Sequence, residues 1–494
     1  MDTAVFPFDN SYAKLPEQFY VKMPPTPVEQ PGLIRVNKGL AELLGLDPAA
    51  LAAPEGVDVL AGNRVAAGSE PLAMAYAGHQ FGGWSPQLGD GRAILLGEVV
   101  GTDGVRRDIQ LKGSGPTPFS RMGDGRAALG PVLREYIVSE AMFALGIPTT
   151  RSLAAVTTGE NVFREGALPG AVLTRVAESH IRVGTFQYFV GKGDMDSVKL
   201  LADHVIARHY PDAAKADRPY IALLDTVMEK QAKLIAQWMQ VGFIHGVMNT
   251  DNTAISGETI DYGPCAFMDI YHPHTVFSSI DQMGRYAYAN QPTVVQWNLA
   301  RFAQCLLPFL DEDEEKGLKD AQEMIDTFPP RFDAALATGY QKKLGLGTEQ
   351  PGDIDLAQDL LKRMVDSTAD FTNTFRRLAN AINPEETGGD QPRDVFREPE
   401  TFDAWAEKWR ARLKQENATP EDIASRLRAA NPKFIPRNHL VEEAIRAAED
   451  NGDFSVFHDL VDVLEKPYEE QPGKDAFTLP PRPDQIVQQT FCGT

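Results

Sequence analysis

Hydrophobic and polar positions change their period along this chain, and the change predicts where strands give way to helices. An apolar run, Ala93–Val100, is followed by a glycine-containing turn sequence at residues 101–104 and a second strand-like run at residues 107–111. Two such runs joined by a short turn are typical of a β-hairpin. A glycine-rich stretch, residues 78–91, precedes the first predicted strand, and Lys112 directly follows the second.

Other segments have the period of a helix. Residues 131–145 begin with proline and are followed by Gly146, which is the punctuation expected at the two ends of a helix. Residues 221–241 carry apolar side chains at helical spacing and predict a long amphipathic helix. Residues 33–51 are interpreted as a short helix and its exit. Mostly helical patterning follows from about residue 292, so the chain combines strands and helices.

Composition narrows the range of partners. The 494 residues carry a formal net charge of −21 at pH 7 and include only 3 cysteines. A strongly acidic surface repels nucleic acid and anionic membranes, so neither is expected as a partner. A small anionic ligand would need its own cluster of cations. The low cysteine count, the absence of a basic N-terminal signal and the lack of a membrane-length apolar run predict a cytoplasmic protein.

One group of residues fits the chemistry of a bound nucleoside triphosphate. Phosphate groups need backbone N–H donors from a glycine loop, cationic side chains and oxygen ligands for a divalent metal. Gly89, Gly91 and Arg92 are candidates for the loop. Lys112 ends a predicted strand, and Glu135 on the next predicted helix is a candidate partner, as in the lysine–glutamate pair of kinases. The alternative is that the two are unrelated surface residues.

A second group follows the long predicted helix. His245 and Asn252 hold the first and last positions of the kinase catalytic-loop spacing H-R-D-x-x-x-x-N. Val247 occupies the position of the catalytic aspartate, and valine cannot accept a proton, so Asp251 is the nearest carboxylate. Asp261 opens a D-Y-G tripeptide that is similar to D-F-G. Asn252 and Asp261 offer the hard oxygen ligands that magnesium prefers.

Several longer motifs extend this pattern over nearly the whole chain. They are residues 76–82 (YAGHQFG), 88–92 (LGDGR), 110–115 (QLKGSG), 123–126 (GDGR), 245–252 (HGVMNTDN) and 261–264 (DYGP). Together they resemble the selenoprotein O family, also called YdiU, of kinase-like protein adenylyltransferases. Later segments at residues 284–286, 290–292 and 431–433 agree with the resemblance.

The resemblance implies a fold and an activity. The expected fold is α+β and protein-kinase-like, with a β-rich N-lobe at residues 71–178 and a mainly helical C-lobe at residues 179–380. An N-terminal extension, residues 1–70, and a helical C-terminal extension with a flexible tail, residues 381–494, flank the lobes. Family members bind ATP in a flipped orientation, so AMP passes to Ser, Thr or Tyr hydroxyls of proteins and pyrophosphate leaves. Magnesium or manganese is the expected cofactor.

The resemblance also implies roles by motif position. Asp251 would be the general base, Lys112 and Glu135 would form the ion pair, and Arg175 and Arg182 would hold the terminal phosphate. The remaining implied site residues are the metal ligands Asn252 and Asp261 and the nucleotide-lining Gly89, Gly91, Arg92, Asp124 and Gly125.

Two other functions stay open at this point. One is an ordinary phosphotransferase that transfers the γ-phosphate to a protein or a small molecule with Asp251 as base. The other is a catalytically inactive nucleotide-binding scaffold, an idea motivated by Val247. Many family members also carry cysteine or selenocysteine near the C-terminus, a position held here by Cys492. A regulatory bond between Cys265 and Cys492 is one hypothesis, and a free Cys265 packed in the core is the preferred one.

Overall fold

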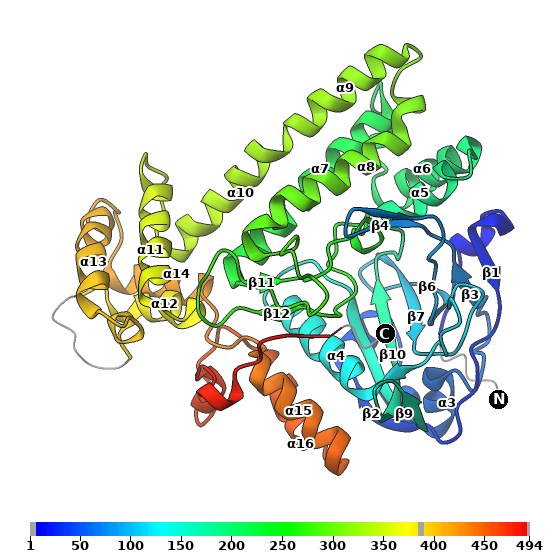
Figure 1. Ribbon diagram of the computed structural model, residues 1–494, viewed down its shortest axis with the longest axis horizontal. Coiled ribbons are helices and arrows are strands. Elements are labelled where there is room, and N and C mark those ends of the chain that lie inside the picture. The colour runs from blue at the N-terminus through cyan, green and yellow to red at the C-terminus, as the bar shows by residue number, and fades with distance from the viewer. Residues whose placement is uncertain (1–5, 384–389, 492–494) are drawn as a thin grey trace.

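A large sheet and a long series of helices make up the mixed α/β fold of this chain in a computed structural model, which describes residues 6–383 and 390–491 (Figure 1). The sheet has the strand order β1-β3-β6-β7-β10-β9-β2, and β8 pairs with β10. The helices α7 to α10 extend away from the sheet, and α15 and α16 lie beside α4 (Figure 1).

The strands are β1 (Tyr20–Lys22), β2 (Gly32–Val36), β3 (Leu72–Met74), β4 (Gly78–Gln80), β5 (Gly83–Ser85), β6 (Ala93–Val100), β7 (Arg106–Lys112), β8 (Ala127–Ala128), β9 (Arg151–Phe163), β10 (Ala167–Ala177), β11 (Phe243–Ile244) and β12 (Ala266–Phe267). The helices are α1 (Lys38–Leu43), α2 (Pro48–Ala52), α3 (Pro54–Ala61), α4 (Leu129–Ala144), α5 (Val183–Val190), α6 (Met195–His209), α7 (Pro219–Val241), α8 (Gln291–Leu310), α9 (Glu314–Asp326), α10 (Phe328–Lys343), α11 (Asp353–Ser367), α12 (Phe371–Arg377), α13 (Pro399–Leu413), α14 (Pro420–Ala430), α15 (Asn438–Asn451) and α16 (Ser455–Leu464).

The predicted hairpin is confirmed as β6 and β7. The two strands are antiparallel, and Ala93 pairs with Lys112 while Leu95 pairs with Gln110. Ile109 and Leu111 on one face of β7 and Gln110 on the other are fully buried, because a strand in the middle of a covered sheet buries both faces. This register places Lys112 at the end of its strand and beside the glycine-rich segment that precedes β6.

The predicted helix at residues 131–145 is confirmed as α4, which begins two residues earlier than expected, at Leu129. Pro131 therefore lies in the first turn, where its missing N–H needs no partner. Gly146 follows the end with φ of 78°, a left-handed conformation that glycine adopts without strain. The helix packs against β9 and β10 on one side and against α15 and α16 on the other, so Glu135 is buried between these layers.

The predicted long helix is confirmed as α7, and it ends shortly before the loop that carries the candidate catalytic residues. Its apolar side chains pack against α8 and α10. Gly242 ends it with φ of 73°, after which β11 pairs with β12 and delivers the loop that begins at His245. This loop contains a single turn of 3₁₀ helix, Thr250–Asn252. Within residues 6–383 and 390–491, no helix combines the length and apolar character needed to cross a membrane.

The prediction of a short helix at residues 33–51 is wrong in its first part. Residues 33–36 belong to β2, which pairs with β9 at one edge of the sheet. The helix α1 starts only at Lys38, where the Asn37 side chain accepts a hydrogen bond from the backbone N–H of Leu40. Since β2 is held by a strand more than a hundred residues away, its local pattern carried little information about its structure.

Candidate active site

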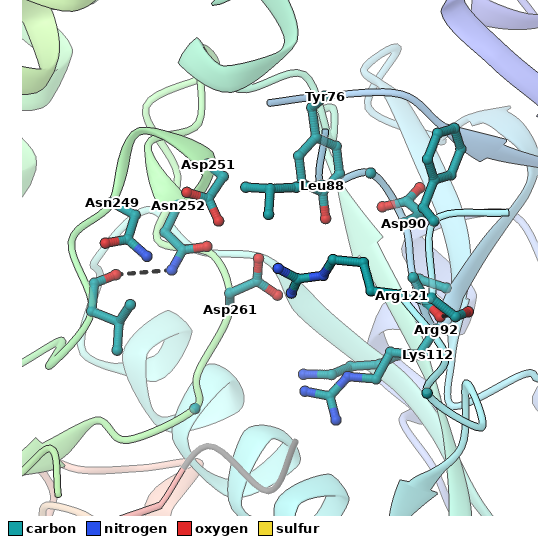
Figure 2. Close-up of a pocket in the computed structure, with 18 of the residues that line it drawn as sticks. Tyr76, Leu88, Asp90, Arg92, Lys112, Arg121, Asn249, Asp251, Asn252 and Asp261 are labelled. Atoms are coloured by element: carbon teal, nitrogen blue, oxygen red, sulfur yellow. Dashed lines mark hydrogen bonds between the residues drawn. The ribbon is translucent and has the colours of Figure 1, made fainter. Parts of the chain in front are cut away.

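A cleft of about 500 Å³ brings together the glycine-rich segments of the sheet and the loops that follow α7. Figure 2 shows Asp251, Asn252 and Asp261 on one wall and Arg92, Lys112 and Arg121 on the other. Of the residues predicted for the site, Glu135 alone lies behind the lining, in contact with Lys112. Those that line the cleft are Gly89, Gly91, Arg92, Lys112, Asp124, Gly125, Arg175, Arg182, Asp251, Asn252 and Asp261.

The cleft is cationic although the chain as a whole is strongly acidic. Its lining includes the cations Arg92, Lys112, Arg121, Arg126, Arg164, Arg175 and Arg182. Among the residues that the structure describes, only four carboxylates, Asp90, Asp124, Asp251 and Asp261, share the lining with them. A local excess of positive charge in a chain with a net charge of −21 marks the place where an anionic ligand is stabilised.

Glu135 joins two cations at the closed end of the cleft. Its carboxylate accepts hydrogen bonds from Lys112 Nζ and Arg175 Nε, and it is 1% exposed. Burial alone would raise the pKa of Glu135, but the charges of Arg175 and Lys112 outweigh it and hold that pKa below the usual range. Burial lowers the pKa of Lys112, as does repulsion by Arg175, and the attraction of Glu135 only partly opposes them. Two cations thus share one carboxylate.

Asp261 continues the same network. Its Oδ1 accepts a hydrogen bond from Arg175 Nη2 at 2.5 Å, and its Oδ2 accepts one from Arg182 Nη1 at 2.9 Å. Burial by itself would raise the pKa of Asp261, but Arg175 and Arg182 hold that pKa well below its usual range. Asp261 also has φ of 63°, a left-handed conformation that costs a non-glycine residue about 1 kcal/mol or more. A fixed, ionised carboxylate therefore faces the cleft.

Arg182 is held by contacts on three sides. Besides Asp261, its guanidinium donates to the backbone carbonyl of Asp251 at 2.8 Å and to that of His180 at 3.2 Å. It also lies over the ring of Tyr76, with 4.4 Å between Cζ and the ring centroid. Cation–π contact and charge-assisted hydrogen bonds fix the direction of the guanidinium before any ligand arrives.

Asp251 has the electrostatic character of a base. It is 6% exposed, and burial raises its pKa to about 6. Its Oδ2 accepts a hydrogen bond from Gln80 Nε2 at 3.0 Å, while its Oδ1 has no hydrogen-bond partner in the described part of the chain. Gly78 leaves room for this carboxylate, because a Cβ there would lie 2.5 Å from Oδ1. A carboxylate with one unsatisfied oxygen and a pKa near neutrality suits proton transfer.

Asn252 is oriented by a neighbour in its own loop. Its Nδ2 donates to the backbone carbonyl of Val247 at 2.8 Å, which turns Oδ1 toward Asp261 in Figure 2. An amide oxygen and an ionised carboxylate are the donor types that magnesium and manganese take. In the described ranges no three His, Cys, Asp or Glu side chains gather as a metal site, so the phosphates of a nucleotide and water would complete the coordination. The residues present fit a nucleotide-bound metal ion.

Two of the predicted site glycines, Gly89 and Gly125, allow close approaches of the chain beside the cleft. Gly89 has φ of 75°, and a Cβ there would lie 2.3 Å from the Phe119 ring. Gly125 also has a left-handed φ, of 67°, and its Cβ would collide with the backbone of Gly115. Asp124 forms an ion pair with Arg164 at 2.8 Å and remains 43% exposed at its side chain. Only glycine permits the chain to approach this closely.

Among the lining residues that escaped prediction from the sequence are Tyr76, Gln80 and Asp90. Asp90 lies between the two predicted loop glycines, is 3% exposed and accepts hydrogen bonds from Met74 N–H and Gln110 Nε2. Gln80 contacts the candidate base, and Tyr76 stacks on Arg182. All three lie in motifs that carry the family resemblance. Their position in these motifs is the signal by which the sequence could have identified them.

Of the two cysteines in the hypothetical regulatory bond, Cys265 and Cys492, the structure describes only Cys265. Cys265 is free and buried, and burial raises the pKa of its thiol to about 12. A thiol that stays protonated is a poor nucleophile, as expected for a packed core cysteine. Cys492 lies outside the described residues.

Comparison with known proteins supplies the class of this enzyme. A protein named "Protein nucleotidyltransferase YdiU" from Bradyrhizobium diazoefficiens is 61% identical over 492 residues, and the match covers 100% of both chains. Proteins of the same name from Rhodopseudomonas palustris strain BisB5 and Methylorubrum extorquens strain PA1 are 62% and 61% identical, again over 100% of both chains. The chain is therefore a nucleotidyltransferase.

The family follows from a second comparison. A family model described as "Protein adenylyltransferase SelO" matches residues 3–465. The chain belongs to this SelO family, which confirms the resemblance seen in its motifs.

Proposed function

We propose that this enzyme transfers AMP from ATP to Ser, Thr or Tyr hydroxyls of other proteins and releases pyrophosphate. The observation that carries the proposal is the position of the buried cations. Lys112, Arg175 and Arg182 are 7%, 3% and 2% exposed, whereas Phe81 and Ile280 at the mouth of the cleft are 37% and 60% exposed. A triphosphate that directs its most highly charged end toward these cations leaves the α-phosphate nearest the mouth, where an acceptor arrives.

The arrangement around the cleft supports a kinase-like, bilobal interpretation of the fold. A strand lysine, Lys112, pairs with a helix glutamate, Glu135, as in the N-lobe of kinases. The loop at residues 245–252 follows a long helix, and Asp261 stands where the metal-binding aspartate of D-F-G would stand. The lobes would be residues 71–178 and 179–380, and the extensions would be residues 1–70 and 381–494.

The chain's own groups account for the proton and for the leaving group. The acceptor hydroxyl oxygen would attack the α-phosphorus, the bond from that phosphorus to the β-bridging oxygen would break, and Asp251 would take the hydroxyl proton. Arg175 and Arg182 would neutralise the charge that grows on the departing pyrophosphate. Both now contact Asp261, so they would share that carboxylate with the phosphates. Magnesium or manganese held by Asn252 and Asp261 would add positive charge at the phosphates.

Labelled ATP tests the proposal directly. The enzyme is incubated with protein acceptors and ATP labelled either at the α-phosphate or at the γ-phosphate. Label in protein from the α-position alone is the expected result. Label from the γ-position alone would instead make the enzyme a kinase, and label from neither would make it a nucleotide-binding scaffold.

A further inference from the structure

A short hairpin, β4 and β5, stands at the mouth of the cleft and connects the candidate base to the surface. Gln80 in this hairpin donates to Asp251, as described above. The next residue, Phe81, donates its backbone N–H to Asn249 Oδ1 at 3.1 Å and to the Tyr286 hydroxyl oxygen at 3.0 Å. Phe81 has φ of 53°, so these contacts hold it in a conformation that costs free energy. Its side chain remains partly exposed to solvent.

Two arginines lie beside this hairpin on a single tryptophan. The Cζ atoms of Arg285 and Arg301 are 5.2 Å and 4.8 Å from the centroid of the Trp297 ring. The ring of His79, from the hairpin, meets the same tryptophan edge-on at 5.3 Å. A Cβ at Gly82 would lie 3.7 Å from the Arg285 guanidinium, so the hairpin touches this group. We call Arg285, Trp297 and Arg301 the arginine platform.

The platform carries two positive charges at partly exposed positions. In the described ranges no ion pair joins either guanidinium to a carboxylate, and the Nε atom of each is buried without a hydrogen-bond partner. Asp281, in the same segment, uses its two oxygens on the backbone N–H groups of Arg285 and Tyr286. Because both side chains are partly exposed, their positive charge is accessible to an external anion in a chain of net charge −21.

Exposed apolar side chains neighbour the platform, either through the His79 ring or along the chain. Trp84 follows the hairpin turn and is 43% exposed, and Ile280 and Met283 precede Arg285 and are 60% and 93% exposed. Exposed aromatic and aliphatic side chains grouped around arginine are typical of protein interfaces rather than of small-anion sites. The surface therefore fits a polypeptide that carries negative charge.

We propose that the arginine platform binds an acidic segment of the acceptor protein and so selects which hydroxyl reaches Asp251. This inference rests on the function proposed above. Gln80 contacts Asp251 and Gly82 contacts Arg285, and because only the hairpin turn joins them, their Cα atoms are at most about 7 Å apart. An extended acceptor segment would therefore carry its Asp or Glu side chain roughly two to four residues from the acceptor hydroxyl. The enzyme's overall negative charge disfavours uniformly acidic proteins, so recognition falls on a local acidic segment.

Peptide binding tests the platform independently of chemistry. Short fluorescent peptides carry one serine and a single glutamate that is moved stepwise along both sides of it, and matched sets carry alanine or lysine instead. Their affinities are measured by fluorescence anisotropy with a non-hydrolysable ATP analogue present. For the wild-type protein, glutamate at one or two positions should tighten binding about tenfold relative to alanine. The double substitution Arg285→Gln with Arg301→Gln should remove this preference.

Two further variants sharpen the interpretation. Arg285→Glu should shift the preference toward the lysine peptides, an inversion that simple loss of folding cannot produce. Arg393→Gln, which removes an exposed arginine paired with Asp403 in the C-terminal helical region, should leave the glutamate preference unchanged. Equal affinities of the wild-type protein for the glutamate, alanine and lysine peptides would overturn the proposal. So would a glutamate preference that survives the double substitution.

The same peptides separate this inference from the proposed function. Transfer of α-labelled AMP to the bound serine is measured in parallel with binding. Glutamate-dependent binding without α-label would retain the platform and contradict AMP transfer. Transfer of α-label that is indifferent to the glutamate would retain AMP transfer and contradict the platform.

Discussion

Gln80 donates a hydrogen bond to Asp251 at 3.0 Å, although the two residues lie 171 positions apart in the chain. This contact leaves the second oxygen of Asp251 without a hydrogen-bond partner among the residues that the structure describes. The hairpin thus holds both oxygens of the candidate base, Oδ2 through the hydrogen bond from Gln80 and Oδ1 by packing against Gly78.

Asp251→Asn tests the role of the base. Asparagine keeps the shape and can still accept from Gln80, but it cannot take a proton from the acceptor. Transfer should fall by about 10²- to 10⁴-fold, while the affinity for ATP, measured by calorimetry, should change little. Turnover close to wild type would remove Asp251 from this role.

Gln80→Leu tests the positioning of that base. The leucine removes the hydrogen bond to Asp251 Oδ2 without touching the buried cations. A lost hydrogen bond of this kind is expected to lower kcat by about tenfold and to leave KM for ATP unchanged. The conservative variant Gln80→Glu should not restore activity, because it places a second carboxylate beside Asp251. A change in KM for ATP alone would contradict a positioning role.

Glu135→Gln tests the shared carboxylate. Lys112 and Arg175 would then be buried with one negative charge fewer between them. Breaking a buried ion pair from one side typically costs about 3–5 kcal/mol, so the free energy of unfolding should drop by that order. Urea denaturation measures the change. Arg134 lies on the same helix as Glu135 and forms an ion pair with the partly exposed Glu442. Glu442→Gln is therefore the matched control, and it should lower the free energy of unfolding much less.

Asp261→Asn tests the metal site. Manganese binding in the presence of ATP, followed by electron paramagnetic resonance, should weaken by at least about tenfold, because the variant loses the only carboxylate of the proposed ligand pair. Removal of the metal by a chelator should stop transfer in the wild-type enzyme. Asp90→Asn changes another buried carboxylate of the same cleft and should leave manganese affinity nearly unchanged.

Lys343→Met tests a buried charge far from the cleft. Lys343 on α10 is 3% exposed, and its Nζ lies 4.2 Å from the centroid of the Phe375 ring. Burial lowers its pKa to about 7 in the folded protein. The unfolded chain binds this proton up to pH of about 10, so the contribution of Lys343 to stability improves as the pH rises from about 7 toward 10.

Methionine should therefore raise the free energy of unfolding near neutral pH by about 2–4 kcal/mol, with a smaller gain at alkaline pH. Thermal denaturation at several pH values measures both effects. Lys342→Met, at the exposed neighbouring position, is the control and should shift stability little. A wild-type stability that does not depend on Lys343 at any pH would contradict the expected burial cost.

Local patterns were sufficient for the elements around the site. The hairpin of β6 and β7, the helix α4 and the helix α7 each follow from turn residues, helix punctuation and the spacing of apolar side chains. These signals act over a few residues and are visible in a single sequence. The strand β2 was missed because its structure depends on β9, a distant partner that no local pattern indicates.

The sequence by itself determined the family, the main elements around the cleft and which residue types could hold phosphate and metal. Only the tertiary structure decided that Arg175 bridges Glu135 and Asp261, that Tyr76 and Gln80 join the site, and that Arg285 and Arg301 share one tryptophan. The physical reason is that these contacts join residues far apart in the chain. Their distances and charges are fixed by the packing of the sheet against the helices, not by any spacing along the sequence.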